Sequence, residues 1–106
     1  MIRGTTPTHK FELPFEVSIL KDLRISYMQN TYGQNDNRLL IDKKMTDCTL
    51  DGNTVLVKLT QEETLKLKHG MEVKIQIKVL TTEGDVLAST VYKKTVKEVL
   101  NEEVLT

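Results

Sequence analysis

The residues of this sequence that could ligate a metal ion or act as a nucleophile are few and far apart. His9, Cys48 and His69 are the only histidine and cysteine residues among the 106 positions. None of them falls in a Cys-x-x-Cys, His-x-x-x-His or His-Glu-x-x-His pattern, the spacings that place two ligands on one turn or one helix face. Cys48 also has no motif that would supply a histidine base. We therefore expect no metal site and no catalytic cysteine.

Other sequence patterns that would indicate catalysis or cofactor binding are also absent or weak. Glu62-Glu63 and Glu102-Glu103 are adjacent carboxylates, but neighbours in sequence need not point into one cleft, and we interpret the two pairs as a helix cap and a solvated tail. The five glycines stand alone at positions 4, 33, 52, 70 and 84, so no phosphate-binding loop is present. The sequence thus predicts no catalytic, cofactor-binding or metal-ligating residue, and a protein that is not an enzyme.

Charge and composition narrow the classes of partner. Fifteen basic and fifteen acidic residues give a formal net charge of zero, which disfavours binding to nucleic acid or to an acidic membrane surface. There is no tryptophan and only five Tyr and Phe residues, which counts against a sugar-binding or base-stacking platform. No signal-peptide pattern and no membrane-length apolar run occurs, so we expect synthesis in the cytoplasm. The single cysteine, Cys48, excludes an internal disulfide.

The elements that would position any functional surface are organised around residues 71–92. From Met71 to Val79 apolar and polar residues alternate without a break, as expected for a strand with one buried and one solvated face. Glu83-Gly84-Asp85 then turns the chain, and a second β-rich run begins at Val86. Residues 86–96 read as one long strand or as a strand bent near Lys93-Lys94. A lone hairpin is marginally stable in water, so the remaining segments must cover its apolar face.

Those segments supply further strands and one short helix. Asp51-Gly52-Asn53 predicts a hairpin turn, and Thr60 with Glu63 has the capping-box spacing that predicts a helical turn near 61–66. His9 is expected on a strand face. Residues 29–37 are expected to form a polar loop that does not enter the core. The further strands are predicted at 8–13, 22–28, 38–44, 47–50 and 54–59. We therefore predict one all-β domain over 1–106, an immunoglobulin-like antiparallel β-sandwich of about seven strands.

Three segments are candidates for contact with partners: an N-terminal arm at 1–7, the loop at 29–37, and a C-terminal tail at 97–106. The arm is either a frayed terminus or a docking segment, and the loop is either a mobile hairpin tip or a contact loop. Apolar residues recur at helix-like intervals in the tail, which packs either on its own domain or on a neighbour. The candidate contact residues are Ile2, Arg3, Pro7, Tyr32, Val99, Leu100, Val104 and Leu105.

Several stretches resemble a family of small uncharacterised proteins in phages and prophages of Gram-positive bacteria. They are Met1 to His9, Leu59 to Thr64, Val73 to Thr82, Gly84 to Ser89 and Glu103 to Leu105. A looser resemblance, over Thr54 to Ser89, is to the small β-sandwich at the N-terminus of phage upper-baseplate proteins. The loop at 29–37 is longer than the family pattern.

The resemblance implies a non-enzymatic virion component of the tail, baseplate, neck or capsid surface. Such a protein would act in many copies, as a homo-oligomer or in a symmetric assembly with other virion structural proteins, with no cofactor. Two other interpretations belong to different classes. One is a small soluble phage regulator or inhibitor of a host factor, and the other is a carbohydrate-binding module on the virion surface that would use Tyr32.

Overall fold

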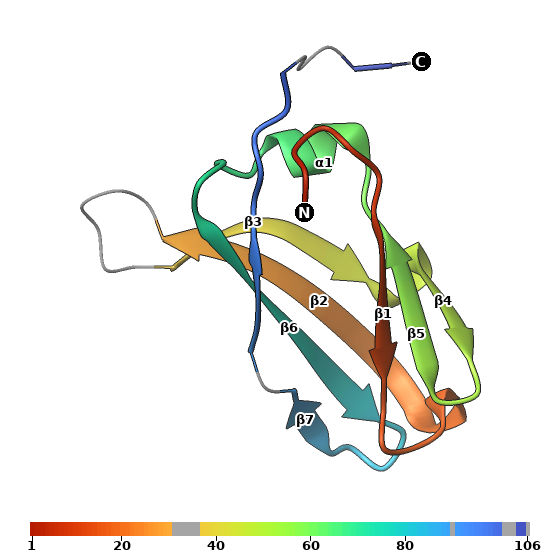
Figure 1. Ribbon diagram of the computed structural model, residues 1–106. Helices are drawn as coiled ribbons and strands as arrows, with labels where there is room; N and C mark the ends of the chain where they lie inside the picture. The colour runs from red at the N-terminus through yellow and green to blue at the C-terminus, as the bar shows by residue number, and fades with distance from the viewer. Residues whose placement is uncertain (31–36, 90, 101–103, 106) are drawn as a thin grey trace.

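Two antiparallel sheets pack face to face (Figure 1). The computed structural model describes residues 1–30, 37–89, 91–100 and 104–105. The smaller sheet has the order β1-β5-β4, formed by Thr8–Glu12, Thr54–Lys58 and Cys48–Asp51. The larger sheet contains β3 (Asn37–Lys44), β2 (Leu20–Asn30) and β6 (Glu72–Thr81), followed by β7 (Val86–Ala88) and β8 (Tyr92–Thr95), which both pair with β6. The predicted all-β sandwich is confirmed.

The core lies between the sheets and follows the alternation of the sequence. In β6 the side chains of Val73, Ile75, Ile77 and Val79 are buried, as the pattern of 71–79 predicts. β2 runs antiparallel beside β6, and Ile25 stands opposite Ile77 in the register. The other buried apolar residues are Phe11, Leu13, Leu20, Leu23, Tyr27, Ile41, Val55, Val57, Leu59, Leu67 and Val96. Both sheets contribute, so the apolar face of β6 is covered as expected, while β7 remains exposed.

The connections follow the turn signals in the sequence. Gly52, with φ of 60°, closes the predicted hairpin between β4 and β5. The helix α1 (Gln61–Leu65) begins with the predicted capping box: Glu63 N donates to Thr60 Oγ1 at 3.1 Å, and Thr60 N donates to Glu63 Oε1 at 2.9 Å. Two 3-10 turns, η1 (Val17–Ile19) and η2 (Met45–Asp47), lead into β2 and β4. Within the described ranges, no helix is long and apolar enough to cross a membrane.

Both bounds predicted for the polar loop, 29 and 37, are wrong, because β2 extends through Asn30 and β3 begins at Asn37. Gln29 belongs to β2 and is only 2 % exposed. Its amide is satisfied by the backbone of Lys68, because Gln29 Nε2 donates to Lys68 O at 3.0 Å and Lys68 N donates to Gln29 Oε1 at 2.8 Å. A polar residue is therefore tolerated in the interior once both of its hydrogen-bonding groups have partners.

The last β-rich run is neither one strand nor bent at Lys93-Lys94, since it divides between Ala88 and Tyr92. Ser89 marks the division. Its amide donates to Ile77 O at 2.9 Å, and its hydroxyl accepts from Ile77 N at 3.1 Å, in the place of a backbone carbonyl. β7 therefore pairs with one part of β6 and β8 with another, and the described chain has eight strands where about seven are expected.

Candidate interaction site

The two predicted contact segments at the ends of the chain lie side by side. Residues 1–3 run parallel to residues 95–97, and we call these six residues the terminal pair. The Met1 amino group donates to Thr95 O at 3.0 Å, Lys97 N donates to Met1 O at 2.7 Å, and Arg3 N donates to Lys97 O at 3.2 Å. In Figure 1 both segments pass the same end of the sandwich as α1. The start of the arm is thus hydrogen-bonded to its own chain and is not frayed in this structure.

The arm is fixed to the domain along its whole length. The guanidinium of Arg3 donates to Leu65 O at 2.9 Å, at the end of α1. The hydroxyl of Thr64 donates to Thr5 O at 2.8 Å, and Leu59 N donates to Pro7 O at 3.0 Å. These bonds hold the arm against α1 and lead it into β1.

The tail departs from the sandwich after Val96, which is buried. The side-chain amide of Gln61 then binds the backbone of Leu105: Gln61 Nε2 donates to Leu105 O at 2.7 Å, and Leu105 N donates to Gln61 Oε1 at 2.8 Å. Leu100 and Leu105 nevertheless leave 99 % and 74 % of their area exposed, and Ile2 leaves 44 %. Three large apolar side chains therefore face solvent at one end of the molecule.

The structure brings together most of the predicted contact residues and leaves two aside. Pro7 lies between this end and β1, and Tyr32 falls outside the described residues. The described parts of the tail, 97–100 and 104–105, contain no helix, so the helix-like spacing finds no support there. Val104 is half-buried, and so is Val99, which lies close to Gly4. We call the exposed residues Ile2, Leu100 and Leu105 the terminal patch.

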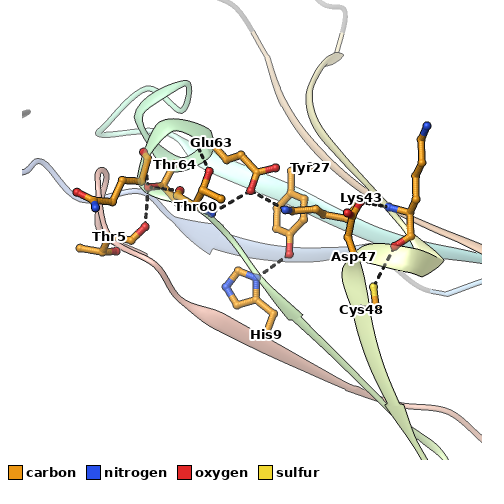
Figure 2. A network of polar contacts seen from close by, with 11 residues as sticks. Thr5, His9, Tyr27, Lys43, Asp47, Cys48, Thr60, Glu63 and Thr64 are labelled. Atoms are coloured by element: carbon orange, nitrogen blue, oxygen red, sulfur yellow. Dashed lines mark hydrogen bonds and ion pairs between the residues drawn. The ribbon is translucent and has the colours of Figure 1, made fainter. Parts of the chain in front are cut away.

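A network of polar contacts lies beside this end of the sandwich (Figure 2). Lys43 Nζ, on β3, reaches Glu63 Oε1 at 2.6 Å, and the same oxygen accepts from Thr60 N. Burial favours the neutral acid, but the bonds from Lys43 and Thr60 outweigh it and hold the pKa of Glu63 below its ordinary value. The ion pair therefore ties the larger sheet to the first turn of α1.

His9 and Tyr27 join the two sheets through the core. His9 Nδ1 lies 2.7 Å from the hydroxyl of Tyr27, and the rings stack with centroids 5.6 Å apart. Burial, then the charges of Lys94 and the N-terminal amine, lowers the pKa of His9 to about 4. Burial, with the charges of Cys48 and Glu63, raises the pKa of Tyr27. Both residues are neutral near pH 7, and His9 occupies the strand face that the sequence predicts.

Cys48 lies at the other end of this network (Figure 2). Burial and Asp47 raise the pKa of Cys48, which favours the thiol over the reactive thiolate, and its Sγ donates to Lys44 O at 3.4 Å. Within the ranges the structure describes, no three His, Cys, Asp or Glu side chains lie close enough together to hold a metal ion.

Sequence reasoning missed two parts of the surface. Gln61 gave no signal, because an amide that binds a residue 44 positions away has no local pattern. The second missed part is the exposed apolar surface of residues 86–92, and the sequence did contain a signal for it. Apolar residues are adjacent in Val86-Leu87 and Val91-Tyr92, so in an extended chain one of each pair must point outward. All four are exposed in the structure.

The chain matches no protein-family model and no curated protein sequence.

Proposed function

We propose that this chain is a non-enzymatic structural protein of a phage particle, present in multiple copies, that binds neighbouring virion proteins through the terminal patch. The observation that carries the proposal is the exposure of Ile2, Leu100 and Leu105, of which Ile2 and Leu105 lie on segments that are themselves tied down by hydrogen bonds. Apolar side chains held in place but left uncovered are typical of contact surfaces between proteins. The sequence resemblance to phage proteins is the reason for proposing a phage particle as the place where this surface acts.

A patch of this size would be sufficient for stable binding if the same contact were repeated many times in one assembly. Three side chains bury too little area for a stable pairwise complex, since standard interfaces bury about 1,600 Å² in total. In a ring or lattice, each contact gains from the others, because the partners are already held close together. The proposal therefore requires a symmetric particle, and the tail, baseplate, neck and capsid surface all offer one.

The first experiment asks where the protein is found. Particles purified from a phage or prophage that encodes the chain are analysed by mass spectrometry after chemical cross-linking. We expect the chain in the particles, with cross-links from Lys97 or the N-terminal amine to another structural protein. Its presence only in the lysate, and not in purified particles, would show a soluble regulator and refute the proposal.

A second experiment tests the patch itself. We expect Leu100→Glu/Leu105→Glu, or deletion of residues 98–106, to leave the sandwich folded and to prevent incorporation into particles. Val96 is retained in the truncated chain because it belongs to the core. The matched control is Leu39→Glu, which makes the same change at an exposed leucine on β3. Normal incorporation of the patch variants, or equal loss in the control, would contradict the assignment.

A further inference from the structure

One side of the sandwich is open. The edge strand β1 of the smaller sheet faces β8 and β7 of the larger sheet, and a groove runs between them. One part of it, about 480 Å³, is lined by all five residues of β1 with Ile75, Tyr92 and Lys94. An adjoining part of about 270 Å³ shares Phe11, Glu12 and Tyr92 with the first and continues along β7. Figure 1 shows β1 at the border of its sheet, with β5 on its other side.

The free edge of β1 exposes backbone groups whose direction follows from the register. Leu59 N donates to Pro7 O and Leu13 N donates to Asn53 O, so the odd-numbered residues 7 to 13 form the hydrogen-bonded pairs with β5. In an antiparallel ladder the residues between them point their N–H and C=O groups to the other side. The backbone groups of Thr8, Lys10 and Glu12 therefore point away from β5, and β5 is the only described strand with which β1 pairs.

The side chains along this edge are self-complementary. Lys10 and Glu12 share the outer face of β1, are both exposed, and form an ion pair at 3.3 Å within the strand. If two copies of β1 run antiparallel about a two-fold axis through Phe11, Lys10 of each copy stands opposite Glu12 of the other. Both residues present free backbone groups, so the same register forms hydrogen-bonded pairs. Shifting it by one step to a centre on Lys10 would place two lysines opposite each other, which is unfavourable.

Apolar residues next to the edge also lack a cover. Leu87 on β7 and Tyr92 on β8 line the groove and are exposed, and the ring of Tyr92 lies 5.8 Å from that of Phe11. Unprotected strand edges with neighbouring apolar side chains are sites at which chains add to one another. A second copy is the occupant that satisfies the charges, the backbone groups and the apolar side chains together.

We propose that two copies of this chain form a symmetric dimer through their β1 strands, which join the two three-stranded sheets into one six-stranded sheet centred on Phe11. The dimer is the unit from which the proposed multi-copy assembly is built, so the inference deepens that proposal. It uses the open side of the sandwich and leaves the terminal patch free for other virion proteins.

Disulfide trapping tests the register. In a Cys48→Ser background, Lys10→Cys and Glu12→Cys chains are prepared separately and mixed in a glutathione redox buffer. Directly opposite residues of an antiparallel pair have Cα atoms about 5.5 Å apart, within the range that a disulfide spans. We expect a covalent dimer from the mixture and little from either variant alone. A dimer from Lys10→Cys alone, or none from the mixture, would overturn the inference.

Charge exchange gives an independent test without new disulfides. Lys10→Glu places like charges opposite each other twice per dimer, and we expect the dissociation constant measured by analytical ultracentrifugation to rise about tenfold. The double variant Lys10→Glu/Glu12→Lys restores the pairing and should dimerise like the natural chain. Lys78→Glu, the same change on the outer face of β6, is the control and should have no effect. A monomeric natural chain, or no rescue by the double variant, would refute the dimer.

Failure of this inference and failure of the proposed function are distinguishable. A chain that is monomeric in both tests but present in purified particles would refute the β1 dimer and leave the virion role intact. A chain that dimerises through β1 but is absent from purified particles would support the dimer and refute the virion role.

Discussion

His9 on β1 and Tyr27 on β2 form a hydrogen bond of 2.7 Å that crosses the core from one sheet to the other. The hydroxyl of Tyr27 has no access to water, since the residue is 0 % exposed. Such a bond fixes the position of one sheet relative to the other, because hydrogen bonds are directional and the contacts between the surrounding apolar side chains are not.

Tyr27→Phe should lower the free energy of unfolding by about 1–2 kcal/mol, because it leaves Nδ1 of half-buried His9 without its partner. Urea denaturation followed by circular dichroism measures the change. Tyr92→Phe, at an exposed tyrosine, should change stability by less than about 0.5 kcal/mol. Equal stability of Tyr27→Phe and the natural protein would show that the bond contributes nothing.

Acid should weaken the fold through His9. Its pKa is lowered, by burial first and then by Lys94 and the N-terminal amine, to about 4 in the folded protein from 6.5. The unfolded chain therefore takes up the proton first, so this stability is fully present above about pH 6.5 and is lost as the pH falls toward about 4. The full shift corresponds to about 3 kcal/mol, which partial solvent exposure of the ring reduces to about 1–2 kcal/mol.

Urea titrations between about pH 7 and about pH 4 measure this loss. His9→Gln does not titrate in this range and should lose less stability over it. A variant that follows the same pH dependence as the natural protein would assign the effect to other groups, of which Glu63 is the first candidate because its lowered pKa acts in the more acidic part of the range.

Lys43→Met should cost about 1–3 kcal/mol, because the Glu63 carboxylate loses the ammonium 2.6 Å away in a largely buried position. Glu63→Gln keeps the cap on α1, since glutamine also serves at this position of a capping box. In a Glu63→Gln background the added cost of Lys43→Met should fall below about 1 kcal/mol. Thermal or urea unfolding of the four proteins gives this coupling directly, and additive costs would exclude it.

Gln61→Ala should release the tail without unfolding the domain. The Leu105 amide loses its acceptor, and we expect its hydrogen exchange to quicken by about tenfold while global stability changes by less than about 0.5 kcal/mol. Gln61→Glu keeps an acceptor for Leu105 N–H but loses the donor, so it should show a smaller effect. Unchanged exchange at Leu105 in Gln61→Ala would mean that another contact holds the tail.

The sheets could be predicted from the sequence because their causes are local. The alternation of 71–79, the Gly52 turn and the Thr60–Glu63 capping box each act within a few residues, and all are present in the structure. Gln29 and Ser89 were not predictable in this way. Each is placed by a bond to a backbone group 39 or 12 positions away, which no window of neighbouring residues reveals.

The parts of the candidate interaction site could be predicted from the sequence, but their arrangement could not. Exposed leucines in a charged tail can be seen in the sequence, but the alignment of residues 1–3 with 95–97 depends on where the intervening strands bring the two segments. The open edge of β1 is a property of strand order. The sequence predicts a strand over Thr8 to Leu13, and only the topology shows that one of its edges has no neighbouring strand among the described residues.

The terminal pair determines how the domain would bear a mechanical load. Its two segments run in the same direction, and three hydrogen bonds join them at Met1, Arg3 and Lys97. Tension applied outward at the two ends would slide the segments past each other, so the three bonds would resist in shear and break together rather than peel apart singly. A domain pulled through its ends in a contracting or bending assembly would then yield at a force threshold instead of unravelling gradually.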